Sequence, residues 1–148
     1  MIGKTPIDLH LKRALLLDSA KAWIEANTDE LRELIVNLIR YNQLTEEGVN
    51  SEGNIIGYYS QMTEILSEGR KKRGEPYDLN DTGEFFRSMY VQVLADSIVV
   101  NADYAKMEDQ NWWNINILNL TDENLEVYIE EIKQNYVKEA RRILELNR

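Results

Sequence analysis

The sequence predicts an α+β fold: long N-terminal helices, a small antiparallel β-sheet with a hairpin, and a long C-terminal helix. Apolar residues recur at helical spacing at both ends of the chain, and two short segments of high β-propensity lie between these ends, at residues 89–94 and 97–102. The chain has 148 residues, enough for one domain with a substantial core. We expect a single domain over residues 1–148, helical over 1–44 and mixed α+β over 45–148.

The N-terminal part is predicted to hold two amphipathic helices. Residues 7–26 have apolar side chains at mostly helical spacing, and residues 29–43 repeat them with a clearer helical period. Thr28 lies between the two and is placed to accept a hydrogen bond from an amide at the start of the second helix. A single long bent helix is the alternative, because Asn-Thr is tolerated within helices at modest cost.

The middle of the chain is predicted to form loops and one short helix. Three glycines break the periodicity between residues 45 and 59, which predicts a loop with Ile55-Ile56 as a candidate short strand. Residues 60–67 predict a short helix. The glycine-flanked basic segment 69–74 that follows is typical of an exposed, flexible loop.

A helical turn and a hairpin come next. Gly83 is placed to permit a tight turn into residues 84–89, and Thr82 can cap that turn. The two β segments then predict an antiparallel hairpin around Ala95-Asp96. The apolar positions of the two strands are Val91, Val93, Ile98 and Val100.

The last predicted element is a long helix that begins after a capping sequence, Thr121-Asp-Glu-Asn. One apolar stripe then runs along it for about six turns. We expect the hairpin to lie against this helix. The stripe consists of Leu125, Tyr128, Ile129, Ile132, Tyr136, Val137, Ala140, Ile143 and Leu144.

The composition offers no convincing catalytic group. Cysteine is absent, which excludes thiolate catalysis and Cys-based zinc sites. His10 is the only histidine, and its place between Leu9 and Leu11 indicates a surface or packing role. The acids of the C-terminal helix alternate with cations opposite the apolar stripe, so they form a solvated face. No phosphate-binding, nucleophile-elbow or zinc-protease motif is present, and we expect a protein without enzymatic activity or cofactor.

One segment has the first half of a calcium-binding pattern. Asp78, Asn80 and Thr82 stand at ligand positions 1, 3 and 5, and Gly83 stands at position 6. Position 12 requires a bidentate glutamate, and here it is Met89. Because the most important ligand is missing, we expect no metal site.

Charge and hydropathy limit the partners. The net charge of −9 argues against a free-standing nucleic-acid binder. No apolar run approaches the roughly 18 residues that a membrane span needs, and the first residues lack the pattern of a signal peptide. We therefore expect synthesis in the cytoplasm and no membrane partner.

Two clusters are candidate interface residues. The consecutive cations Arg70, Lys71, Lys72 and Arg73 are expected to be solvated or to pair with acids on a neighbouring copy, in preference to nucleic acid. Trp112 and Trp113 cannot both face inward in a strand, so one is a candidate interface anchor. If their segment is irregular, both could belong to the core.

Four motifs follow one another in the second part of the chain. They are the basic run preceded by Thr63, the segment LNDTGEFFRSM at 79–89, the strand IVVNADYA at 98–105, and the helix entry ILNLT at 117–121. In this order they resemble the virion-morphogenesis and tail-completion proteins of tailed phages, a group that includes the Mu-type virion morphogenesis family. The resemblance covers about residues 45–148.

Three positions depart from the family pattern. Phe85 stands where leucine is usual, Asn119 stands where glycine is usual, and Lys106-Met-Glu-Asp replaces a His-x-x-Gly motif. The resemblance implies a virion structural protein that forms a ring at the neck, between the portal-connector and the tail, or at the tail terminator. The partners it implies are other copies of the chain, connector proteins and tail proteins, with at most incidental contact with packaged DNA.

Two functions of other classes are also open. One is a small acidic adaptor or inhibitor in the cytoplasm that binds a basic partner. The other is a hydrolase that uses carboxylates, which is the least favoured because the acids lie on solvated faces. Self-association separates the first two possibilities, because a ring subunit oligomerises whereas an adaptor stays monomeric.

Overall fold

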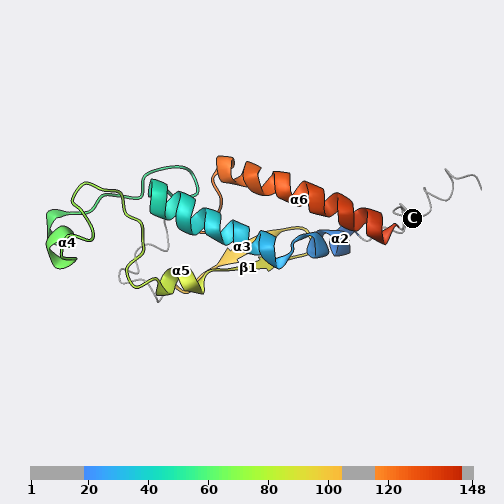
Figure 1. The fold of residues 1–148 in the computed structure, drawn as a ribbon, viewed down its shortest axis with the longest axis horizontal. Helices are drawn as coiled ribbons and strands as arrows, with labels where there is room; N and C mark the ends of the chain where they lie inside the picture. The colour runs from blue at the N-terminus through green and yellow to red at the C-terminus, as the bar shows by residue number, and fades with distance from the viewer. Residues whose placement is uncertain (1–18, 105–115, 145–148) are drawn as a thin grey trace, which may run out of the picture.

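The computed structural model describes residues 19–104 and 116–144, which form an elongated molecule (Figure 1). It confirms the α+β prediction, with helices, a two-stranded antiparallel sheet and a long C-terminal helix. The elements in chain order are α2 (Ser19–Ala26), α3 (Asp29–Asn37), the π-helix η1 (Leu38–Glu47), α4 (Gln61–Leu66), α5 (Glu84–Ser88), β1 (Tyr90–Val93), β2 (Ile98–Asn101) and α6 (Asp122–Ile143).

Helices α2 and α3 are separated by a break at Asn27-Thr28, so the alternative of one continuous helix is wrong. The Thr28 hydroxyl accepts a hydrogen bond from the Leu31 amide at 3.4 Å, which confirms its predicted role as a cap. Asn27 is buried, and its Nδ2 donates to the Trp23 carbonyl at 2.9 Å. Side chains thus bond to the backbone on both sides of this break. Residues 7–18 of the predicted first helix, with His10, lie outside the described residues.

Helical structure continues further than predicted, because η1 extends the run of α3 to Glu47. The predicted loop therefore begins at Gly48, whose left-handed backbone (φ 63°) ends the helix. In a π-helix each amide pairs with a carbonyl five residues back, and the Thr45 hydroxyl adds a bond of the same span to the Arg40 carbonyl at 2.6 Å. Inside this wide turn, Gln43 and Leu44 are both fully buried.

The loop after η1 contains less sheet than predicted. The candidate strand at Ile55-Ile56 is reduced to a single bridge between Val49 and Ile55. The short helix predicted at 60–67 is confirmed as α4, and the Ser60 hydroxyl caps it by accepting from the Thr63 amide at 3.2 Å.

Gly83 immediately precedes helix α5, and its φ of 78° confirms the predicted tight turn. The Thr82 hydroxyl accepts a hydrogen bond from the Glu84 amide at 3.3 Å. The N-cap position itself is occupied by the next residue, Gly83. Met89, at the end of this helix, is buried in the core.

Replacing Gly83 by valine is expected to destabilise the protein by about 1–3 kcal/mol, because a β-branched residue resists the left-handed region. An added Cβ would also approach the flexible Arg87 side chain to 2.8 Å. Urea unfolding of the variant measures the loss. Gly83→Asn is the control, since asparagine tolerates this conformation and should lose less. A valine variant as stable as the parent would show that the glycine is incidental.

The hairpin is antiparallel as predicted, and its register places Val91 opposite Val100 and Val93 opposite Ile98. The turn is closed by the Leu94 amide, which donates to the Ser97 carbonyl at 2.8 Å. Because directly opposed residues lie on the same side of a sheet, these four apolar side chains share one face of the hairpin.

The hairpin packs on α3, and α6 packs on α2 and α3 from the other side (Figure 1). The expected contact of the hairpin with the terminal helix is thus wrong. The physical reason is that α3 and η1 carry apolar residues on more than one face, so this helical run is the central layer. Its buried apolar residues are Leu31, Ile35, Val36, Leu38, Ile39 and Leu44.

The C-terminal helix α6 is capped by Thr121 as predicted, since its hydroxyl accepts from the Asn124 amide at 3.3 Å. Tyr128 and Ile132 are buried, but Leu125 and Val137 are exposed, so the apolar stripe is narrower than predicted. Within residues 19–104 and 116–144, no helix combines the length and hydropathy that crossing a bilayer requires.

Buried polar groups join the layers. Tyr128 donates through its hydroxyl to Asn27 Oδ1 at 2.6 Å, and burial raises the pKa of Tyr128 to about 12, so the donor keeps its proton at neutral pH. Gln43 joins η1 to the start of α6. Its Nε2 donates to the Asn119 carbonyl at 2.9 Å, and its Oε1 accepts from the Thr121 amide at 2.9 Å and from Asn124 Nδ2 at 3.0 Å.

Candidate assembly surface

Residues 58–78 form an arm that projects from one end of the molecule, with α4 at its tip (Figure 1). The two ends of the arm pair with each other. Tyr58 forms a bridge with Pro76, the Tyr59 amide donates to the Glu75 carbonyl at 2.9 Å, and the Gly74 amide donates to the Tyr59 carbonyl at 3.0 Å. The arm is therefore a closed loop with a defined base.

Helix α4 has no buried residue. Met62, Ile65 and Leu66 lie on one helical face and are 63%, 63% and 76% exposed. Tyr58, at the base of the arm, is exposed too. An amphipathic helix normally turns such a stripe toward a core, so α4 presents an apolar face that none of residues 19–104 and 116–144 covers.

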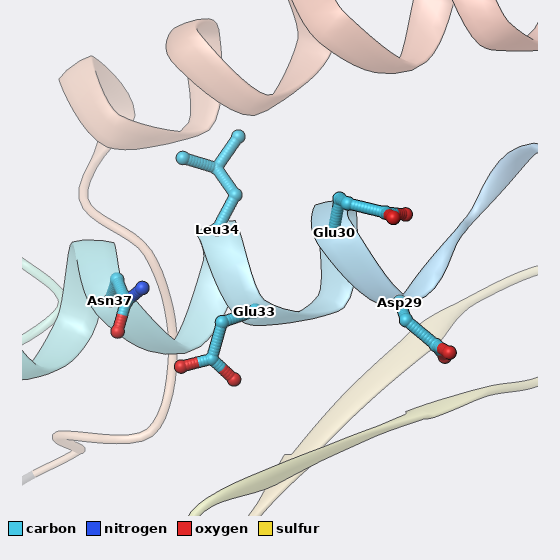
Figure 2. A pocket seen from close by; sticks show the side chains of 5 residues that line it. All are labelled: Asp29, Glu30, Glu33, Leu34 and Asn37. Carbon is cyan, nitrogen blue, oxygen red and sulfur yellow. The ribbon is translucent and has the colours of Figure 1, made fainter.

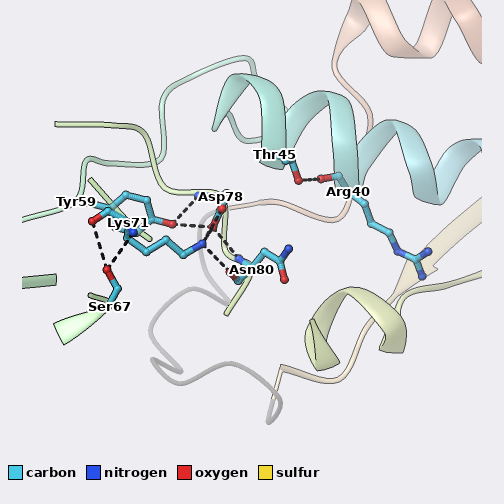
Figure 3. A network of polar contacts seen from close by, with 7 residues as sticks. All are labelled: Arg40, Thr45, Tyr59, Ser67, Lys71, Asp78 and Asn80. Carbon is cyan, nitrogen blue, oxygen red and sulfur yellow. Dashed lines mark hydrogen bonds and ion pairs between the residues drawn. The ribbon is translucent and has the colours of Figure 1, made fainter. Parts of the chain in front are cut away.

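A polar cluster holds the arm in shape (Figure 3). The Lys71 ammonium donates to both Asp78 carboxylate oxygens and to the Asn80 carbonyl, each at 2.7 Å. The Tyr59 hydroxyl donates to Asp78 Oδ1, also at 2.7 Å. The side chains of Lys71 and Asp78 are only 18% and 25% exposed, so this pair is sheltered from solvent. We call Tyr59, Lys71, Asp78 and Asn80 the latch.

The latch shifts the pKa of its acids in opposite directions. Partial burial raises the pKa of the Asp78 carboxyl, but hydrogen bonds from Lys71, Tyr59 and the Asn80 amide, with the Lys71 charge, outweigh this and place it below its ordinary value. Burial is the main cause that raises the pKa of Tyr59, with the Asp78 charge acting in the same direction. At neutral pH the latch is therefore a carboxylate held by an ammonium and a phenol.

Replacing Asp78 by asparagine is expected to loosen the arm, because the Lys71 charge then loses its counter-charge in a sheltered site. Trypsin should cleave this variant faster than the parent within residues 70–73. The control is Asp81→Asn, which makes the same exchange at an exposed position and leaves the trypsin sites unchanged, so its cleavage rate should equal that of the parent. In the parent, the carboxylate contributes its stabilisation fully above its unfolded pKa of about 3.9 and loses it as the pH falls through the lower folded pKa. A carboxyl ¹³C shift of Asp78 that titrates at or above this ordinary value would contradict the latch.

The predicted basic run is divided by this arrangement. Lys71 is turned into the latch, so the expectation that all four cations are solvated or available to a neighbour is wrong at this position. Arg70, Lys72 and Arg73 are exposed. The Arg70 Nε donates to the Ser67 carbonyl at 3.1 Å, which anchors the side chain near the end of α4.

The half calcium pattern has another use in the structure. The Asp78 carboxylate holds a lysine ammonium, the Thr82 hydroxyl accepts from the Glu84 amide, and Met89 belongs to the core. Among residues 19–104 and 116–144, no group of three or more histidine, aspartate or glutamate side chains has a metal-binding arrangement.

A polar pocket of about 310 Å³ adjoins the latch, lined by Thr45, Glu46, Tyr59, Arg70, Lys71, Glu75, Pro76 and Asp78.

A second concave surface lies on α3 (Figure 2). This α3 recess is open, measures about 570 Å³ and is lined by Asp29, Glu30, Glu33, Leu34 and Asn37. The three acids are exposed, and the apolar member of the lining is Leu34, which is half-buried and packs against the core. Glu33 also pairs with Arg40 at 3.2 Å, on the side of η1.

The sequence did not single out the two surfaces that stand out in the structure. Met62, Ile65 and Leu66 have the i, i+3, i+4 spacing of a buried stripe, and only the fold shows that nothing within the described residues covers them. The acids of the α3 recess appear in the sequence as helix-start residues. The predicted anchors Trp112 and Trp113 lie outside the described residues.

No protein-family model, no curated protein and no solved structure matches this chain.

Proposed function

We propose that this protein is a non-enzymatic structural subunit of a tailed-phage virion, which forms a ring at the neck or at the tail terminator. The observation that carries the proposal is the arm, a folded projection whose helix exposes three apolar side chains. The resemblance of residues 79–89 and 98–105 to virion-morphogenesis proteins supports the same assignment. The implied partners are other copies of the chain, portal-connector proteins and tail proteins.

The energetics of the arm favour an assembly. Three apolar side chains that are 63–76% exposed on one short helix gain at most about 1.5–3 kcal/mol each when they become fully buried, and no described residue of the chain provides that burial. The latch keeps the arm in one conformation before contact, which lowers the entropy that association must cost. A preformed projection with an uncovered apolar face is what a building block of a ring requires.

The hairpin adds a second feature that suits assembly. Among the described residues the sheet has two strands, so both β1 and β2 have an outer edge with backbone groups available for pairing. Ring-forming subunits use such edges and loops for contacts with their neighbours, and a rotation between copies closes the ring.

The test is the oligomeric state of the purified full chain. Native mass spectrometry and negative-stain electron microscopy should show a closed ring with one copy number. Co-expression with portal-connector and tail proteins should yield a joint complex. A chain that remains monomeric at every concentration and joins no such complex would contradict the proposal and favour the acidic adaptor.

A further inference from the structure

We propose that the apolar face of α4 and the exposed cations beside it dock into the α3 recess of a second copy of this chain. The inference rests on the proposed function, because it names the contact through which neighbouring ring subunits meet. It assigns the arm as the donor surface and the recess as the acceptor surface.

The donor surface has two chemical parts. Met62, Ile65 and Leu66 supply an apolar patch, and the turns that follow α4 supply three cations. Among the residues that the structure describes, these cations make no ion pair. They are Arg70, Lys72 and Arg73. The same segment also holds the exposed acids Glu68 and Glu75, and its three cations beside an apolar helix suit a partner surface that is apolar in part and acidic.

The acceptor surface has the same two parts with the opposite charge. The α3 recess is lined by Leu34, whose side chain points toward α6 in Figure 2, and by the acids Asp29, Glu30 and Glu33, all exposed. The three cations on the arm of one copy are thus matched by three acids on the recess of the next. Each surface also offers apolar area that the other can cover. Glu33 stays accessible although it pairs with Arg40, because its side chain is 60% exposed.

The two surfaces cannot meet within one molecule in this arrangement. Figure 1 shows the arm beyond the end of η1, whereas Asp29 begins α3 at the opposite end of the same helical run. The contact is therefore between different copies and joins unlike surfaces. Such a head-to-tail contact repeats from copy to copy and closes into a ring when the rotation allows it.

Charge exchange tests the pairing. Sedimentation velocity of the full chain measures the concentration at which half of it is assembled. Reversing the arm (Arg70→Glu, Lys72→Glu, Arg73→Glu) should raise this concentration about tenfold or more, and so should reversing the recess (Glu30→Lys, Glu33→Lys). Combining the two reversals should restore assembly toward that of the parent.

Three further measurements complete the test. Ile65→Ser with Leu66→Ser should weaken assembly without loss of folding, because both side chains are exposed. Lys138→Glu, a charge reversal at an exposed position of α6, is the matched control and should leave assembly unchanged. Added salt should weaken assembly of the parent.

The outcomes separate the two proposals. If the variant with the reversed arm assembles as well as the parent, the arm–recess contact is overturned while the ring remains. The same follows if the combined reversal does not restore assembly. A parent chain that never assembles would overturn both the contact and the ring.

Discussion

Replacing Gln43 by leucine is expected to destabilise the protein by about 2–5 kcal/mol. The side chain is fully buried, and it satisfies the Thr121 amide and the Asn124 side-chain amide at the start of α6. Leucine has a similar volume but no acceptor, so both donors would remain in the core without a partner. Removing one partner of a buried hydrogen bond exposes the full desolvation cost of the other.

Chemical denaturation followed by circular dichroism measures this loss. Gln92→Leu is the matched control, because Gln92 lies exposed on β1 and the same exchange should change stability by no more than about 0.5 kcal/mol. Equal stability of the two variants would mean that Gln43 does not tie η1 to α6.

Replacing Phe85 by alanine is expected to cost about 3–5 kcal/mol, the range for a buried phenylalanine. Phe85 is almost fully buried. The centroid of its ring lies 5.7 Å from the ring centroid of Tyr104 and 6.4 Å from that of Phe86. It also joins α5 to the chain after the hairpin. The Ser88 hydroxyl donates to the Phe85 carbonyl at 2.6 Å and accepts from the Asp103 amide at 2.9 Å.

Phe85→Leu is the informative second variant. Leucine is the residue usual at this position in the phage proteins that the segment resembles, and it retains much of the apolar volume. We expect a loss of about 1–2 kcal/mol for leucine, well below that for alanine, in the same denaturation measurement. If the alanine variant loses no more stability than the leucine variant, the core has collapsed around the substitution. The aromatic ring of Phe85 would then contribute little to the stability of the core.

The elements that the sequence predicts correctly depend on local signals. Thr28 and Thr121 cap their helices through hydrogen bonds within three residues, and the hairpin follows from two adjacent β segments. The extension of η1 to Glu47 was missed because it depends on burial of Gln43 and Leu44 by distant parts of the chain. Sequence periodicity does not report such contacts.

The position of the hairpin fails for a related reason. A stripe of apolar residues shows that a helix has a buried face, but it does not say which element covers that face. The stripe on α6 is largely covered by α2, which leaves α3 to receive the hairpin on its opposite side. Only the three-dimensional arrangement shows that α3 is buried from two sides.

The candidate surface was predictable in part. The basic run drew attention to the right segment, and Arg70, Lys72 and Arg73 are exposed there. Lys71 has the same chemistry as its neighbours in the sequence. Its pairing with Asp78 becomes visible only in the folded arm. The apolar face of α4 was hidden for the opposite reason, since its pattern is that of an ordinary core helix.

The closed base of the arm also divides the molecule into parts of unequal local stability. The hydrogen bonds that shape the arm lie within residues 58–80, and α4 contributes no buried side chain to the core. Opening the arm therefore exposes little new apolar area and leaves the layers around α3 intact. Its backbone amides should exchange with solvent through local opening at far lower free energy than those of α3 and α6, which exchange only when the core opens.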